Sequence, residues 1–183
     1  MKYLALIFLM VLTSCNFEKS ESSDKHILKQ VENSKEKWNT TTYYLIRHAE
    51  KDRSNPSEKD PKLTEEGKKR AENWKKVLEE VPFDMIYSTK FNRTKETAEP
   101  IAKAKNLEVE FYDSEDMYNL EFQQKTKGKT VLIVGHSNTT PAFANAIIKK
   151  QKYSDLPDDE NGGLFIISIT PTNRISSQVL YIN

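Results

Sequence analysis

The sequence is poor in cysteine and in surplus charge, and each shortage excludes a class of site. Cys15 is the single cysteine among 183 residues, so the chain cannot form an internal disulfide. The net charge is only +1, which leaves no overall field to recruit nucleic acid or an anionic surface. Any site that binds an anion must therefore be built locally.

The N-terminal apolar run is too short to cross a bilayer comfortably. Residues 3–12 are fewer than the roughly 20 that a membrane-spanning helix needs. This run follows Lys2 and precedes Leu12-Thr13-Ser14-Cys15, which resembles the lipobox of a bacterial lipoprotein. We expect residues 1–15 to be a signal peptide with Cys15 lipidated, and residues 16–39 to be a tether with an edge helix. The protein would then be lipid-anchored in the cell envelope, facing the periplasm or in the outer membrane; an ordinary signal peptide is the alternative.

From residue 40 to residue 183, apolar strand-like runs alternate with helical patterns. Strands are expected at residues 41–47, 84–88, 107–112 and 130–134, and helices after Thr64, after Ser88 or Thr89, within 115–125 and over 138–150. The last two runs, 164–170 and 175–182, flank a turn and predict a hairpin at the sheet edge. This order predicts an α/β three-layer sandwich with a mostly parallel sheet flanked by helices.

Two of the three histidines stand where a strand-like run ends. Arg47 and His48 close the first run, and His136 follows the fourth. Ligands of parallel sheets bind at the carboxyl ends of the strands. We therefore expect these residues to lie along one edge with Ser88, and Arg93 to reach the same edge from the first turn of a helix.

This set of side chains suits a phosphoryl group. A neutral imidazole can attack phosphorus, which makes His48 a candidate nucleophile. Guanidinium groups pair with phosphoryl oxygens and keep their charge, and a protonated His136 would donate a further hydrogen bond. No metal or cofactor is then required. Two histidines with a carboxylate could instead bind zinc, but a cation site does not recruit arginines. Ser88 and Ser137 lack the glycine elbow of a serine hydrolase and are interpreted as phosphate-side or capping hydroxyls.

Four motifs in this order resemble the histidine phosphatase superfamily, in its phosphoglycerate mutase-like branch. The resemblance runs from about residue 41 to the C-terminus and implies a phosphohistidine on His48, a phosphate pocket and no cofactor. It also implies that Arg53 is a further phosphate ligand. The motifs are Arg47-His48-Ala49-Glu50, Leu63-Thr64-Glu65-Glu66-Gly67, Tyr87-Ser88-Thr89 with Arg93-Thr94, and Gly135-His136-Ser137; the implied pocket consists of Arg47, Arg93 and His136.

The chain departs from the family pattern in two ways. Ala49 replaces the usual glycine, and no general acid is evident. The candidates for that acid are Glu50, Asp116, Glu121, Asp158, Asp159 and Glu160. The short stretch between Arg93 and His136 leaves no room for a large lid, which favours a bulky or protein-borne phosphoryl group. We expect a metal-independent phosphatase; the alternatives are a phosphate-binding module without turnover, a phosphomutase, or a structural surface lipoprotein. The lysine-rich segments are interpreted as solvated helix faces, with no nucleic-acid partner.

Overall fold

The computed structural model describes residues 39–182. The expected signal peptide, the lipidation of Cys15, and the tether and edge helix therefore lie outside the described residues, apart from Asn39. In the described range, no helix has the length and apolar character needed to cross a membrane.

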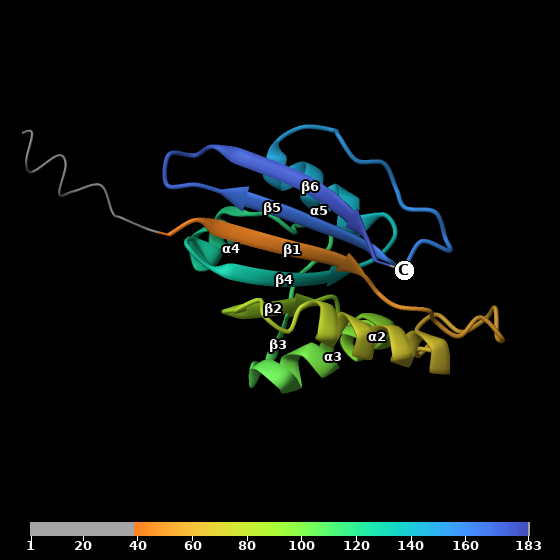
Figure 1. Ribbon diagram of the computed structural model, residues 1–183. Coiled ribbons are helices and arrows are strands. Elements are labelled where there is room, and N and C mark those ends of the chain that lie inside the picture. Colours follow the sequence, from red (N-terminus) through yellow and green to blue (C-terminus); the bar gives the residue numbers. More distant parts are fainter. Residues whose placement is uncertain (1–38, 183) are drawn as a thin grey trace, which may run out of the picture. The chain divides into compact units, whose positions relative to one another are not determined.

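Six strands form one sheet in the order β3-β2-β4-β1-β5-β6 (Figure 1). β4 lies between β1 and β2 and runs parallel to both, β3 runs parallel to β2, and β5 and β6 are antiparallel additions beyond β1. This confirms the mostly parallel sheet with a C-terminal hairpin at its edge. The strand bounds are β1 Thr41–Arg47, β2 Met85–Ser88, β3 Val109–Phe111, β4 Thr130–Gly135, β5 Gly163–Ile169 and β6 Ile175–Tyr181.

Helices cover both faces of this sheet. Because successive side chains of a strand point to opposite faces, Leu45 packs in a core with Phe143 of α5, whereas Ile46 packs in a second core with Trp74 of α2. The three-layer sandwich is therefore confirmed. The first face is covered by α4 (Leu120–Thr126) and α5 (Thr139–Ile148), and the second by α2 (Glu65–Val77) and α3 (Asn92–Lys105).

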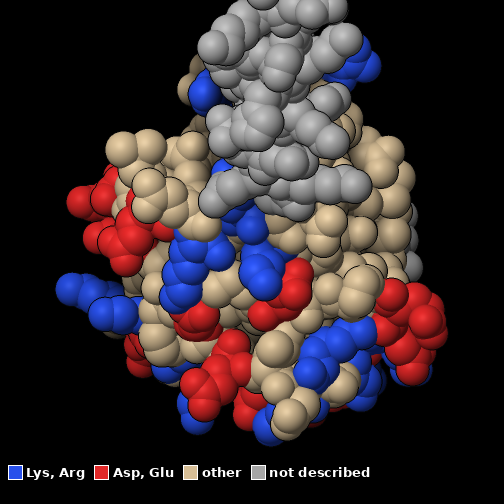
Figure 2. All heavy atoms as spheres, turned by 90° about the vertical axis from the view of Figure 1, so that its left-hand side faces the viewer, with Lys and Arg blue, Asp and Glu red and all other residues tan. Residues whose placement is uncertain are grey.

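The strand register brings the carboxyl ends of three strands to one edge of the sheet. Arg47 of β1 pairs with Gly135 of β4, and Ser88 of β2 pairs with Val134. The strands therefore finish almost level, and the residues that follow them meet at the same rim. The opposite end of the sheet, where the amino ends of these strands lie, shows positive and negative side chains interspersed over its surface (Figure 2).

The start of α2 is built as the sequence predicts. The side chain of Thr64 accepts a hydrogen bond from the Gly67 N–H at 3.0 Å, which caps the helix. A Cβ atom on Gly67 would lie 2.2 Å from the carbonyl oxygen of Glu50. Only glycine lets the first turn of α2 press against the chain immediately after His48.

The start of α3 contradicts the sequence prediction. Neither Ser88 nor Thr89 caps this helix; the N-cap is Phe91, which makes no side-chain capping bond and is 40% exposed. A carboxylate from elsewhere replaces the missing cap, since Asp60 Oδ1 accepts the N–H of Asn92 at 2.7 Å. Because this cap comes from a loop 32 residues earlier, the local pattern could not reveal it.

Candidate active site

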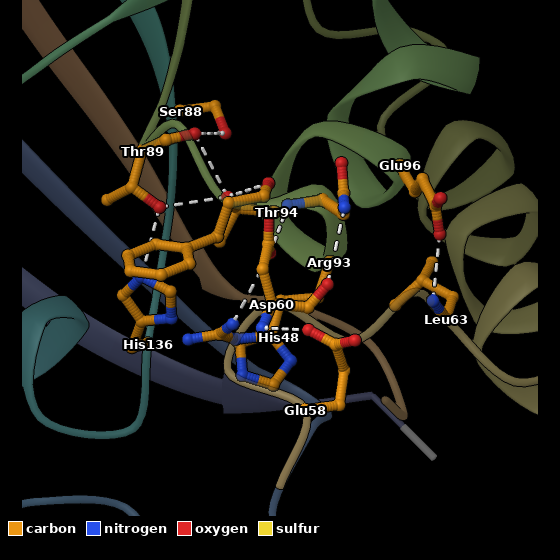
Figure 3. A network of polar contacts seen from close by, with 12 residues as sticks. His48, Glu58, Asp60, Leu63, Ser88, Thr89, Arg93, Thr94, Glu96 and His136 are labelled. Carbon is orange, nitrogen blue, oxygen red and sulfur yellow. Dashed lines mark hydrogen bonds and ion pairs between the residues drawn. The ribbon is translucent and has the colours of Figure 1, made fainter. Parts of the chain in front are cut away.

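Two imidazoles and a guanidinium converge at the carboxyl edge of the sheet. The ring centroids of His48 and His136 lie 5.5 Å apart. The ring of Phe91 packs between His136 and Arg93, with its centroid 5.2 Å from the centroid of the His136 ring and 4.4 Å from Cζ of Arg93. Figure 3 shows the two histidines and Arg93 facing one small region. The structure thus brings these three side chains together.

The imidazole of His48 is fixed in one tautomer. Its backbone N–H donates to the Gly135 carbonyl at 2.9 Å, and its carbonyl accepts from Asn161 Nδ2 at 2.7 Å. Nδ1 lies 2.7 Å from the carbonyl oxygen of Ala49. A carbonyl can only accept, so Nδ1 carries the hydrogen and the neutral ring keeps its lone pair on Nε2.

The surroundings of His48 keep the ring neutral. Burial is the main reason that its pKa falls to about 3, and the nearby Arg47 and Arg93 lower it further. The carbonyl of Ala49 acts in the opposite direction but does not prevail. At neutral pH, His48 is therefore an uncharged imidazole with a free Nε2, the form that attacks phosphorus.

The surroundings of His136 also favour the neutral ring, so its role as a protonated donor stays a prediction. Burial, followed by the charge of Arg93, lowers its pKa to about 4. Its Nε2 lies 2.9 Å from Thr89 Oγ1, and its buried Nδ1 has no partner among the described residues. Gly135 permits this placement, because a Cβ there would lie 2.8 Å from Thr140 Oγ1. The ring thus presents one unengaged nitrogen to the site.

Arg93 offers donors that the described protein does not use. Its side chain is only 13% exposed, and Nη1 lies 3.8 Å from Asp60 Oδ1, too far for a hydrogen bond. Within residues 39–182, its buried Nε and Nη1 have no hydrogen-bond partner. A buried donor without an acceptor is costly. The observation points to an anion as the missing acceptor.

Arg47 was expected to offer its guanidinium group to phosphate, but the structure shows it largely bonded to protein. It is almost fully buried, and Nη1 donates to the carbonyls of Pro157 and Glu160 at 2.6 and 3.0 Å. Nη2 donates to Asp158 Oδ1 at 3.1 Å. Only Nε lacks a partner in the described part of the chain. The loop before β5 therefore engages most of the guanidinium that sequence reasoning assigned to phosphate.

A cavity of about 560 Å³ opens beside His48. Of the candidate general acids, Glu50, Asp158 and Asp159 line it, whereas Asp116 and Glu121 line a separate pocket of about 250 Å³. The structure therefore separates the last two from His48. The complete lining is His48, Glu50, Lys51, Arg53, Glu66, Arg70, Asp158, Asp159 and Asn161.

The polar residues around the cavity are engaged to different degrees. Glu50 Oε1 accepts from Arg70 Nε at 2.6 Å, while its buried Oε2 has no partner in residues 39–182. Glu160 Oε1 accepts from the N–H of Gly162 at 2.7 Å. The half-exposed Arg53 forms an ion pair with Asp158, with Nη1 2.8 Å from Oδ2. No three His, Cys, Asp or Glu side chains of the described range cluster as metal ligands would.

The two candidate serines are placed differently. Ser88 is fully buried, and its hydroxyl donates to the carbonyl of Thr89 at 2.8 Å, so it points away from a ligand. Ser137 lies next to His136 and is partly exposed. Sequence reasoning missed Thr89 and Asn161 as partners of the two histidines. The only sign of their role in the sequence was their position: Thr89 directly follows the end of β2, and Asn161 directly follows the acidic loop of residues 158–160.

Sequence comparison finds one family over the first part of this domain. The sequence model described as "Histidine phosphatase superfamily (branch 1)" matches residues 43–114. Phosphoserine phosphatase 1 of Hydrogenobacter thermophilus is 46% identical to this chain over 70 residues. That match covers 36% of this chain and 33% of the relative. The chain therefore matches about a third of the length of this curated protein.

Solved structures match nearly the whole domain. The putative phosphohistidine phosphatase SixA from Agrobacterium tumefaciens has a TM-score of 0.58 at 22% identity, over 78% of this chain and 99% of that chain. The phosphoserine phosphatase of Entamoeba histolytica in complex with 3-phosphoglyceric acid has a TM-score of 0.59 at 14% identity, over 78% and 97%. These likenesses show the fold. The sequence match to the histidine phosphatase superfamily covers residues 43–114, and the likeness of the remaining domain to these solved structures concerns the fold alone.

Proposed function

We propose that this protein is a phosphatase that hydrolyses a phosphoric monoester through a phosphohistidine on His48. The observation that carries this proposal is the free Nε2 of a neutral, buried imidazole beside the unpaired donors of Arg93. A nucleophile without charge and a nearby cation with two unused donors together suit an attack on a phosphoryl group. The matches to phosphatases in sequence and fold support the same reaction class.

The reaction has two balanced displacements. In the first, Nε2 of His48 forms a bond to phosphorus, while the bond to the leaving oxygen breaks and that oxygen departs with the electron pair. In the second, water attacks the phosphohistidine, the N–P bond breaks, its electron pair returns to Nε2 and orthophosphate leaves. Nε and Nη1 of Arg93, with Nε of Arg47, donate to the phosphoryl oxygens in both steps. Each arginine, counted as one preorganised donor group, lowers the barrier by about 2.7–4 kcal/mol. The chain's own side chains would supply this stabilisation without a metal ion.

The leaving oxygen needs a proton unless it is already a weak base. Glu50 and Asp159 both line the cavity and are the candidates for the acid that gives this proton and recovers it from water. Without an acid, the enzyme would act on a good leaving group, such as a phosphohistidine or an acyl phosphate. The short lid and open cavity favour a bulky or protein-borne phosphoryl group. Lipid attachment through Cys15 would hold this activity in the cell envelope.

Trapping the intermediate tests the proposal. The full chain is mixed with a radiolabelled phosphate donor, quenched and digested, and the labelled peptide is identified under conditions that preserve phosphohistidine. We expect label on the peptide that contains His48 and none in His48→Ala. His26→Ala, which removes the third histidine, is the matched control and should retain the label. Full hydrolysis by His48→Ala would refute the proposal.

A phosphate-binding module without turnover is the second candidate. The engagement of Arg47 by the loop before β5 favours it, because a clamp already bonded to protein stabilises a transition state less well. Binding of vanadate without hydrolysis of any activated phosphoester would support this alternative. A phosphomutase is favoured less, since a mutase must shield its phosphohistidine from water and the cavity beside His48 is open.

A further inference from the structure

A carboxylate of the protein occupies an anion position between two arginines. Asp158 Oδ1 lies 3.1 Å from Arg47 Nη2, and Oδ2 lies 2.8 Å from Arg53 Nη1. Arg53 Nη2 also donates to the backbone carbonyl of Asp158 at 3.3 Å. Asp158 and Arg53 line the same cavity as His48. The bridge therefore stands beside the nucleophile.

The two sides of this bridge differ in how firmly they are held. The Arg47 side chain is 2% exposed and is fixed by the carbonyls of Pro157 and Glu160. The Asp158 side chain is 71% exposed, so it can turn into solvent with little loss of packing. Carboxylate and phosphoryl groups present oxygens to a guanidinium in similar ways. An incoming phosphoryl group can therefore take the place of Asp158 while Arg47 stays in position.

We propose that Asp158 is a specificity-determining residue whose carboxylate competes with the phosphoryl group for Arg47 and Arg53. This inference rests on the proposed function, since it concerns the ligand of the same site. Free orthophosphate must displace the carboxylate with the contacts of the phosphoryl group alone, so it binds weakly. A larger phosphorylated substrate gains contacts along the cavity that offset the displacement. Asp158 thus selects bulky phosphoryl compounds over the small product, and it favours product release.

The charges around Asp158 support this competition. Hydrogen bonding to Arg53 and the charges of both arginines hold the pKa of the Asp158 carboxyl below its usual range, so the competing anion persists across the physiological range. Lys51 lines the same cavity, and burial, followed by the nearby charges of Arg53 and Arg93, lowers its pKa. Removal of the carboxylate would leave Arg47 Nη2 and Arg53 Nη1 without the acceptor that Asp158 provides, and an external anion would bind more tightly.

The test measures the binding of orthophosphate to the full chain by isothermal titration calorimetry. We expect Asp158→Asn to bind orthophosphate at least fivefold more tightly than the wild type. Asp158→Ala should change the affinity in the same direction, which excludes an effect of the new amide. Asp155→Asn is the matched control: it removes the same charge from an exposed position three residues earlier, and its affinity should change less than twofold.

A further variant ties the effect to the bridge. Arg53→Gln in the Asp158→Asn background should remove most of the gain, because Arg53 is one of the two groups released. Unchanged or weaker phosphate binding in both Asp158 variants would overturn the inference, as would an equal gain in Asp155→Asn. Repeating the titration in the His48→Ala background separates the two proposals. Tighter binding there, without hydrolysis by any variant that retains His48, would support the role of Asp158 while refuting the phosphatase.

Discussion

Acidification should lower the free energy of unfolding, because His48 resists protonation in the folded protein. The folded pKa is about 3, against an ordinary value of 6.5. As the pH falls through 6.5, the unfolded chain gains a proton that the folded chain refuses until about pH 3. Stability is therefore fully present above pH 6.5 and is lost below it, by about 1.4 kcal/mol per pH unit. At pH 4.5, two units below the ordinary value, the loss attributable to His48 is about 3 kcal/mol.

Urea unfolding at pH 7.0 and pH 4.5 measures this loss. The free energy of unfolding is compared between the wild type and His48→Gln, which cannot be protonated at this position. We expect the wild type to lose about 3 kcal/mol more than the variant between the two pH values. The reasoning would be refuted if both proteins lost the same stability to within about 1 kcal/mol, because His48 would then be charged in the folded state or accessible to water.

Three further substitutions probe the site and its support. Arg93→Gln should lower kcat/KM by about 100- to 1000-fold, the effect of removing one preorganised donor group, while circular dichroism shows an unchanged fold. Phe91→Ala should lower kcat/KM by about three- to tenfold, because the stacking that restrains Arg93 is worth roughly 0.5–1 kcal/mol or more; Phe91→Leu, a matched apolar control, should not restore activity. Gly67→Ala should lower the free energy of unfolding by about 1–3 kcal/mol, since its Cβ would collide with the Glu50 carbonyl; an unchanged Tm would show that α2 can move away.

The parts of the site that could be predicted are those fixed by strand ends. β4 is a run of buried apolar residues, and a parallel sheet requires the residues after β1 and β4 to share one rim. That rule alone places His48 beside His136. It also places Arg93 nearby, because α3 follows the neighbouring strand β2.

The contacts that could not be predicted join residues far apart in the chain. Arg47 contacts Asp158 across 111 residues, and Asp60 caps α3 across 32. Nothing in the local sequence distinguishes Asp158, which forms ion pairs with two arginines, from Asp159 next to it. The start of α3 has the same origin, because the remote cap from Asp60 begins the helix one residue after Phe91. Three-dimensional contacts decided each case.

The hydrogen bond from Asn161 to the carbonyl of His48 has a consequence for engineering this protein. It links the segment after the acidic loop, residues 158–160, to the backbone of His48. Grafting a different loop at positions 157–161 to broaden the substrate range would also shift His48 and impair the reaction. Selectivity is better altered one side chain at a time, with Asn161 left in place.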